Sequence, residues 1–123
     1  MIVVADATPI NILVRIAAEG ILPKLFDTVT VPPAVIAELS DGRAPEVLRR
    51  WIASRPSWLT VTPPTAPIVT DVRLGLGERE AIALAIECSA ALLHADDRRA
   101  RREAFRRGPN VAGTIGVLRI AAT

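Results

Sequence analysis

Short apolar runs that alternate with helical patterns constrain the fold of this chain more than any other feature of its sequence. Ile2–Ala5 and Ala91–Ala95 are the clearest of these runs, and Thr28–Val31 is rich in β-branched residues. A strand that is apolar at successive positions is buried on both faces, which is typical of a parallel sheet between two layers of helices. We therefore expect an α/β fold with three layers, α/β/α, around a central, mostly parallel sheet of about four to five short strands.

Helix signals separate the apolar runs. Thr8 is a good N-cap and Pro9 is tolerated at the first helical position, so we expect a helix there whose apolar stripe continues to Ile16 and Ala17 and which ends at Gly20. Further helices are expected at residues 32–40, 46–53, 78–88 and 97–107, and from 113 onward. One or two helical turns at 22–26, short strands at 58–61 and 110–112, and a proline-rich loop at 62–67 complete the pattern.

Length and composition indicate one compact domain. The chain has 123 residues, of which 50% are hydrophobic, so it can build one core and has no room for a second domain. Cys88 is the sole cysteine, which excludes an intramolecular disulfide and cysteine-based zinc sites and favours a reducing, cytoplasmic compartment. The apolar N-terminus lacks a basic segment before Asp6, so it is no signal peptide, and no apolar run is long enough to span a membrane.

Basic residues are unevenly distributed, although the net charge is only +2. Six arginines fall within ten residues of one expected helix: Arg98, Arg99, Arg101, Arg102, Arg106 and Arg107. A solvated helix face is the simplest explanation of such a cluster, and an anionic partner such as RNA is compatible with it. Aromatic residues make up only 3% of the chain and tyrosine is absent, so aromatic base-stacking platforms are not expected.

Two acids follow expected strands directly. Asp6 comes after the first strand and Asp96 after the strand that ends at Ala95, and ligands of open parallel sheets bind beyond these carboxyl ends. Helix capping also explains Asp96 or its neighbour Asp97, since both precede a helix. Capping explains Asp6 less well, because Thr8 beside it is the better candidate.

Three glutamates are further candidates. Glu38 lies at the margin of a helical apolar stripe, from which a side chain can lean into a cleft. Glu78 and Glu80 open a helix that is apolar nearly all round, so periodicity does not choose between them. Acids in the first turn of a helix also interact favourably with the helix dipole, which explains either one without a ligand.

Acids from four separate elements are expected to converge on one cleft: Asp6, Glu38, Glu80 and Asp96. Carboxylates crowded in this way repel one another unless cations offset their charge. Hard oxygen ligands with no His or Cys nearby favour Mg²⁺ or Mn²⁺, and such ions support the hydrolysis of phosphodiesters.

Five segments in order resemble the motifs of PIN domains, in the subgroup related to VapC toxins. They are residues 3–11, 29–39, 77–85, 92–101 and 113–118. The resemblance covers almost the whole chain. It implies a metal-dependent endoribonuclease that cuts single-stranded RNA, acts as the toxin of a toxin–antitoxin pair, and has an antitoxin protein as a further partner.

The resemblance also implies roles for individual residues. It assigns Asp6, Glu38, Glu80 and Asp96 as catalytic ligands of Mg²⁺ or Mn²⁺, and it prefers Glu80 to Glu78 because the acid of the family stands directly before an Ala-Ile pair. Asp97 assists at the metal or caps the following helix. Hydrogen bonds are implied for Thr8, Asn11 and Thr114, and contacts with RNA are expected for Arg98, Arg99, Arg102 and Arg106.

Two features depart from the family pattern. His94 stands where an aliphatic or hydroxyl residue is usual, and we expect a hydrogen-bonded core histidine rather than a ligand. The chain also stops before the C-terminal helices of such proteins, so we expect a second copy or another protein to cover the apolar positions of its last helix. These positions are Ile115, Val117, Leu118 and Ile120.

Two other functions compete with the nuclease. One is a PIN-like module that binds RNA or protein without cutting, or cuts weakly, although a pure RNA binder has no reason to gather acids where phosphate approaches. The other is a response-regulator-like phosphate-transfer domain, which also places acids at strand ends, but nothing in the chain resembles its phosphorylation layout.

Overall fold

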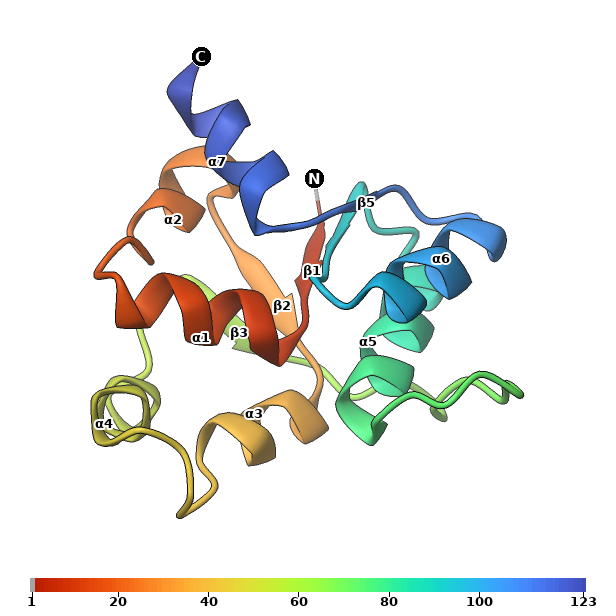
Figure 1. Ribbon diagram of the computed structural model, residues 1–123, viewed down its shortest axis with the longest axis horizontal. Coiled ribbons are helices and arrows are strands. Elements are labelled where there is room, and N and C mark those ends of the chain that lie inside the picture. The colour runs from red at the N-terminus through yellow and green to blue at the C-terminus, as the bar shows by residue number, and fades with distance from the viewer. Residues whose placement is uncertain (1) are drawn as a thin grey trace.

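A computed structural model describes residues 2–123 and contains a single sheet of five strands, each parallel to its neighbours (Figure 1). The order across the sheet is β3-β2-β1-β4-β5. The strands are β1 (Val3–Ala5), β2 (Val29–Val31), β3 (Leu59–Val61), β4 (Leu92–His94) and β5 (Val111–Ala112). The expected α/β class, with its short parallel strands, is confirmed.

Seven helices connect and cover the strands in the described part of the chain (Figure 1). They are α1 (Ala7–Arg15), α2 (Ile21–Phe26), α3 (Pro33–Leu39), α4 (Glu46–Ala53), α5 (Leu76–Glu87), α6 (Arg98–Arg106) and α7 (Thr114–Ala122). None of these helices has the length and apolar character needed to cross a membrane.

The alternation of side chains along β1 creates two cores. Val3 and Ala5 point to a cluster that includes residues of α1, α2, α3, α4 and α7, whereas Val4 points to a cluster with α5 and α6. Successive side chains of a strand face opposite sides of a sheet, so both faces of β1 need a helical cover. The three layers follow from this requirement.

The first helix differs from the expectation at both ends. Asp6, not Thr8, is its N-cap, because Oδ1 of Asp6 accepts a hydrogen bond from the backbone amide of Ala7 at 2.8 Å. The helix also ends at Arg15, so Ile16 leaves the apolar stripe and is 58% exposed. The expected continuation to Gly20 fails where Ala17 adopts φ 57°, a left-handed conformation that is incompatible with a helix.

The last helix is partly buried within its own chain. Val117 is fully buried and Leu118 packs against the same core. Ile115 and Ile120 remain 69% and 48% exposed. That a second copy or another protein covers them stays a prediction.

Helix α5 provides a test of the packing. Leu84 is 1% exposed and Ile86 is 40% exposed, although they are two residues apart. We expect Leu84→Ala to lower the free energy of unfolding by about 2–5 kcal/mol, because it leaves a cavity. The matched change Ile86→Ala is expected to cost less than about 1 kcal/mol. Urea denaturation of both variants measures this, and equal losses would mean that α5 presents a different face to the sheet.

Candidate active site at the carboxyl edge of the sheet

Asp6 lies at the end of the central strand β1 and is only 3% exposed. Its backbone amide donates to the carbonyl of His94 at 2.9 Å, which is part of the parallel pairing of Ala5 with His94. Burial raises the pKa of the Asp6 carboxyl to about 7; the amide of Ala7 opposes this shift, and the negative charges of Glu78, Glu38 and Asp97 add to it. The site therefore holds a buried acid surrounded by other acids.

Helices α3 and α5 each place a glutamate at the start of the other helix. Oε1 of Glu80, from α5, accepts a hydrogen bond from the amide of Ala34 at 3.0 Å, at the start of α3. In return Glu38, from α3, lies over Gly77 in the first turn of α5, where a Cβ would collide with its carboxylate. Each acid thus lies at the N-terminus of the partner helix, where unpaired amides favour negative charge.

The pKa of Glu38 is raised. Burial of its carboxyl is the largest cause, and the charge of Glu78 adds to it, whereas the backbone amide of Gly77 lowers the pKa. Glu78 itself accepts a hydrogen bond from the amide of Gly75 at 2.9 Å, at the start of its own helix. Glu78 therefore caps α5 locally and still acts electrostatically on both Asp6 and Glu38.

Asp96 is bound to the start of α7. Its Oδ1 accepts from the backbone amide of Thr114 at 2.6 Å, and its Oδ2 accepts from the hydroxyl of the same residue. Gly113 permits this approach, since a Cβ there would lie 2.9 Å from Oδ1 of Asp96 and would also meet Arg101. Thr114 thus supports Asp96 directly.

Asp97 caps helix α6. Its Oδ1 accepts from the backbone amide of Ala100 at 3.0 Å, and Arg99 lies 3.9 Å from the same oxygen. Of the two roles considered for this residue, the structure contains the cap.

His94 is fully buried on β4. Its Nε2 lies 3.5 Å from the hydroxyl of Thr114, and its Nδ1 has no hydrogen-bond partner among the described residues. Burial lowers the pKa of His94 to about 4, against the opposing effect of Asp96, so the ring is neutral at neutral pH. It therefore adds no positive charge to the acids around it.

The site residues suit a divalent cation by their chemistry, since they offer hard carboxylate oxygens. Burial is the main cause of the raised pKa of Asp6, and the charges of nearby acids add to it. As the side chains stand, no group of three or more His, Cys, Asp or Glu residues in the described range could hold a metal ion. Glu80 and Asp96 point to amides at helix starts instead. Binding of a cation by all four acids would thus require rotation of these side chains.

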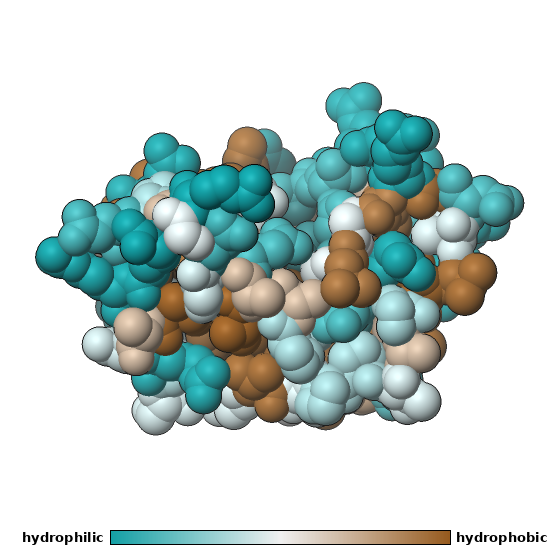
Figure 2. Space-filling view, turned by 90° about the horizontal axis from the view of Figure 1, so that it is seen from below, coloured by the Kyte–Doolittle hydropathy of each residue, from teal (hydrophilic) through white to brown (hydrophobic). Residues whose placement is uncertain are grey.

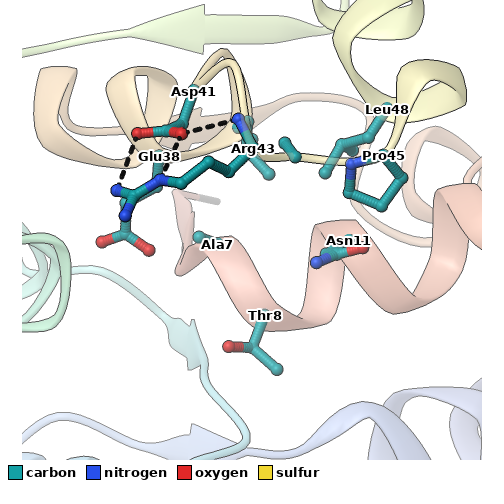
Figure 3. A pocket seen from close by; sticks show the side chains of 10 residues that line it. Ala7, Thr8, Asn11, Glu38, Asp41, Arg43, Pro45 and Leu48 are labelled. Atoms are coloured by element: carbon teal, nitrogen blue, oxygen red, sulfur yellow. Dashed lines mark hydrogen bonds and ion pairs between the residues drawn. The ribbon is translucent and has the colours of Figure 1, made fainter.

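A pocket of about 390 Å³ adjoins the acids on the side of α1 and α3 (Figure 3). Thr8, Asn11 and Glu38 contribute to its wall, together with the segment that joins α3 to α4. Arg43 on this segment binds Asp41 through its backbone amide, Nε and Nη2. The sequence does not predict this pocket, because its residues come from α1, α3, α4 and the segment that joins α3 to α4.

The surface near the site is mixed in character. Seen from the side of α3, hydrophilic side chains cover most of it, and apolar side chains gather in separate groups (Figure 2). The arginines of α6 border a second hollow of about 360 Å³, lined by Arg99, Arg102 and Arg106 with Val72 and Glu103. The helix packs inward through Ala100 and Ala104, whereas Phe105 is 77% exposed.

The raised pKa of Asp6 predicts a pH dependence of stability. Between the ordinary pKa of 3.8 and about 7, the folded state holds a proton that the unfolded state has lost, so this contribution to stability is full below 3.8 and is lost as the pH rises through 7. Asp6→Asn keeps an acceptor for the amide of Ala7 and removes the charge. We expect the free energy of unfolding of the variant to exceed that of the natural protein by a few kcal/mol more at pH 8 than at pH 5. The size follows because a shift of one pKa unit corresponds to about 1.4 kcal/mol.

Urea denaturation in EDTA at both pH values measures the difference in the free energy of unfolding between the variant and the natural protein. His94 titrates in both proteins, so its contribution largely cancels from this difference. Asp41→Asn is the matched control, because Arg43 lowers the pKa of Asp41 and the contribution of that acid is complete by pH 5. If Asp6→Asn raised the free energy of unfolding equally at both pH values, the burial and the raised pKa of the Asp6 carboxyl would be contradicted.

Comparisons with known proteins bear on the family and on the fold. A family model described as a PIN domain matches residues 2–123. Among solved structures, the chain is similar to a PilT N-terminus domain protein from the hyperthermophilic archaeon Sulfolobus solfataricus P2, with a TM-score of 0.68, 18% sequence identity, and coverage of 98% of this chain and 93% of that one. At this identity the likeness shows the fold. No curated protein matches the chain.

Proposed function

This chain belongs to the PIN-domain family, and we propose that it is a metal-dependent endoribonuclease that hydrolyses single-stranded RNA as the toxin of a toxin–antitoxin pair. PIN domains are generally nucleases and typically use divalent metals. The observation that carries the proposal is the position of Asp6 at the end of the central strand, where burial, together with neighbouring acids, raises the pKa of its carboxyl to about 7. An acid with a raised pKa at the carboxyl edge of a parallel sheet is typical of a functional site.

We assign the metal to the acids that the family resemblance selects. Asp6, Glu38, Glu80 and Asp96 would hold Mg²⁺ or Mn²⁺, with Asp97 as the cap beside them. When bound, such a cation offsets the negative charge of the acids and of a phosphodiester and lowers the pKa of a coordinated water. Thr114 would keep Asp96 oriented through its two hydrogen bonds.

Glu80 is preferred to Glu78 because it belongs to the contact between α3 and α5 that also holds Glu38. Glu78 has a local role as the cap of its own helix, and glutamine can keep that hydrogen bond. The electrostatic effect of Glu78 on Asp6 makes it the natural rival in a test.

RNA cleavage by three variants tests the assignment. Asp6→Asn and Glu80→Gln are expected to lower Mn²⁺-dependent cleavage of single-stranded RNA by at least about 100-fold, since each removes a charge that holds the cation. Glu78→Gln is expected to lower it by less than about tenfold, because only a longer-range interaction is lost. EDTA should stop cleavage by the natural protein.

The same proteins give the control, since Mn²⁺ that binds the folded state raises the melting temperature independently of activity. This increase should disappear in Asp6→Asn and Glu80→Gln and persist in Glu78→Gln. If Glu78→Gln is the damaging change, the ligand from α5 is Glu78. Full activity of Asp6→Asn would refute the nuclease site.

The arginines of α6 differ in their availability for RNA. Arg106 binds the buried Glu103 at 2.6 Å, and Arg107 binds the same carboxylate and the carbonyl of Val69. Arg99 has only a 3.9 Å contact with Asp97, and Arg102 forms no ion pair with any described residue. Of the four candidates, we therefore propose Arg99 and Arg102 as the main phosphate contacts, with Arg98 beside them.

The salt dependence of RNA binding tests this choice. In protein carrying Asp6→Asn to prevent cleavage, Arg99→Ala with Arg102→Ala should flatten the slope of log affinity against log salt by about 1.4, since each phosphate contact with a single strand contributes about 0.7. The control pair Arg15→Ala with Arg119→Ala, exposed on other helices, should leave the slope unchanged. Equal slopes in both pairs would mean that α6 presents only a solvated face.

A module that binds RNA or protein without cutting it is the second candidate. It is favoured by the hydrogen bonds that direct Glu80 and Asp96 to helix starts, where they stabilise the fold without any metal. Under this alternative the natural protein would bind RNA, show no cleavage in Mn²⁺, and gain no thermal stability from the ion.

A further inference from the structure

We propose that the pocket between α1 and the segment joining α3 to α4 is a subsite for a nucleobase, with adenine as the base that fits it best. The inference rests on the proposed nuclease function, since the base would belong to a nucleotide next to the cleaved bond. It adds what the acids alone do not provide, which is a means of reading sequence.

The pocket has the size and lining of a site for a flat ring. Its volume is about 390 Å³, and apolar walls come from Leu39 and Leu48 with Ala44 and Pro45. Small-ligand sites combine apolar walls with a few polar groups that fix orientation. Its polar side chains are Thr8 and Asn11 from α1, Glu38 from α3, and the Asp41–Arg43 pair (Figure 3).

Asn11 can both donate a hydrogen bond to a base and accept one from it. Its Oδ1 is buried and accepts no hydrogen bond from any residue that the structure describes. Its amide nitrogen lies on the side of Ala7 and its oxygen on the side of Pro45 (Figure 3). An unpaired buried acceptor costs about 1–3 kcal/mol, so a donor from a ligand would relieve a real penalty.

The chemistry of Asn11 favours adenine. A side-chain amide offers one donor and one acceptor side by side, which match N7 and the 6-amino group of adenine. The two oxygens of Asp41 are already engaged by Arg43, so that pair closes the rim. The terminal torsion of Asn is soft, so a small rotation brings both amide atoms to the base.

The pocket is continuous with the acid site. Glu38 and Ala7 line it, while Glu38 also acts on Asp6 and the amide of Ala7 binds the carboxylate of Asp6. A nucleotide whose phosphate lies near Asp6 would thus have its base beside Asn11. The arginines of α6 do not line this pocket, so they would contact a different part of the strand.

Nuclear magnetic resonance gives a direct test, because Asn11 and Asn110 are the only asparagines and the chain has no glutamine. The side-chain amide region of a ¹⁵N spectrum therefore contains two NH₂ pairs, one of which is an internal control. Adenosine is the probe, since it carries no phosphate and needs no metal. We expect it to shift the NH₂ pair of Asn11 and to leave that of Asn110, which lies near the carbonyl of Ala91, in place.

Inosine is the matched ligand, because it replaces the 6-amino group of adenosine with an oxygen. Its affinity should be lower by about tenfold or more, given that a bidentate base contact discriminates by one or more factors of ten. In Asn11→Leu, followed through the backbone amides of Ala44 and Leu48, the two nucleosides should bind alike. Ribose alone should shift neither pair.

The outcomes separate this inference from the proposed function. Metal-dependent RNA cleavage without any response of Asn11 to adenosine would overturn the subsite and leave the nuclease intact. Discrimination between adenosine and inosine in a protein that cuts no RNA would support the subsite and overturn the nuclease. Equal shifts from adenosine and inosine in the natural protein would show that the pocket does not read bases.

Discussion

Parallel pairing of β1 between β2 and β4 is the constraint on which the rest of the structure depends. Because β1 is covered on both faces and hydrogen-bonded at both edges, its last residue can only be followed by a turn at the carboxyl edge of the sheet. Asp6 occupies that turn, and its amide continues the pairing to His94. A charged group is thereby held where desolvation is greatest, which is why its pKa rises.

Helix starts compensate for the acids that gather at this edge. A carboxylate accepts a backbone amide at the start of five helices: Asp6 at α1, Glu80 at α3, Glu78 at α5, Asp97 at α6 and Asp96 at α7. Each helix start carries a partial positive charge, so together they replace a counter-ion that arginine or lysine would otherwise supply. The same geometry that follows from parallel strands therefore collects both the acids and the dipoles that tolerate them.

The sequence predicted the fold class and the order of elements, because apolar runs and helix signals report burial directly. It also predicted that Asp6 and Asp96 follow strands. It did not predict that Asp6 would cap α1, because local chemistry pointed to Thr8 as the cap. The path of the chain out of β1 places Asp6 there instead. Nor does local pattern show that Glu80 reaches Ala34, 46 positions away, or that Asn11 faces a pocket built from another helix.

Under the proposed metal assignment, cation binding and helix capping would compete at this site, which would link function to stability. Glu80 and Asp96 each give up an amide when they turn toward a cation, and an amide left unpaired in a partly buried place costs about 1–3 kcal/mol. Asp6 has a different balance, because burial and neighbouring charges already destabilise its ionised form. A cation at the proposed site would therefore gain affinity by relieving Asp6, and the caps of α3 and α7 would reduce that gain. The acids are thus arranged so that the cation-free fold remains stable.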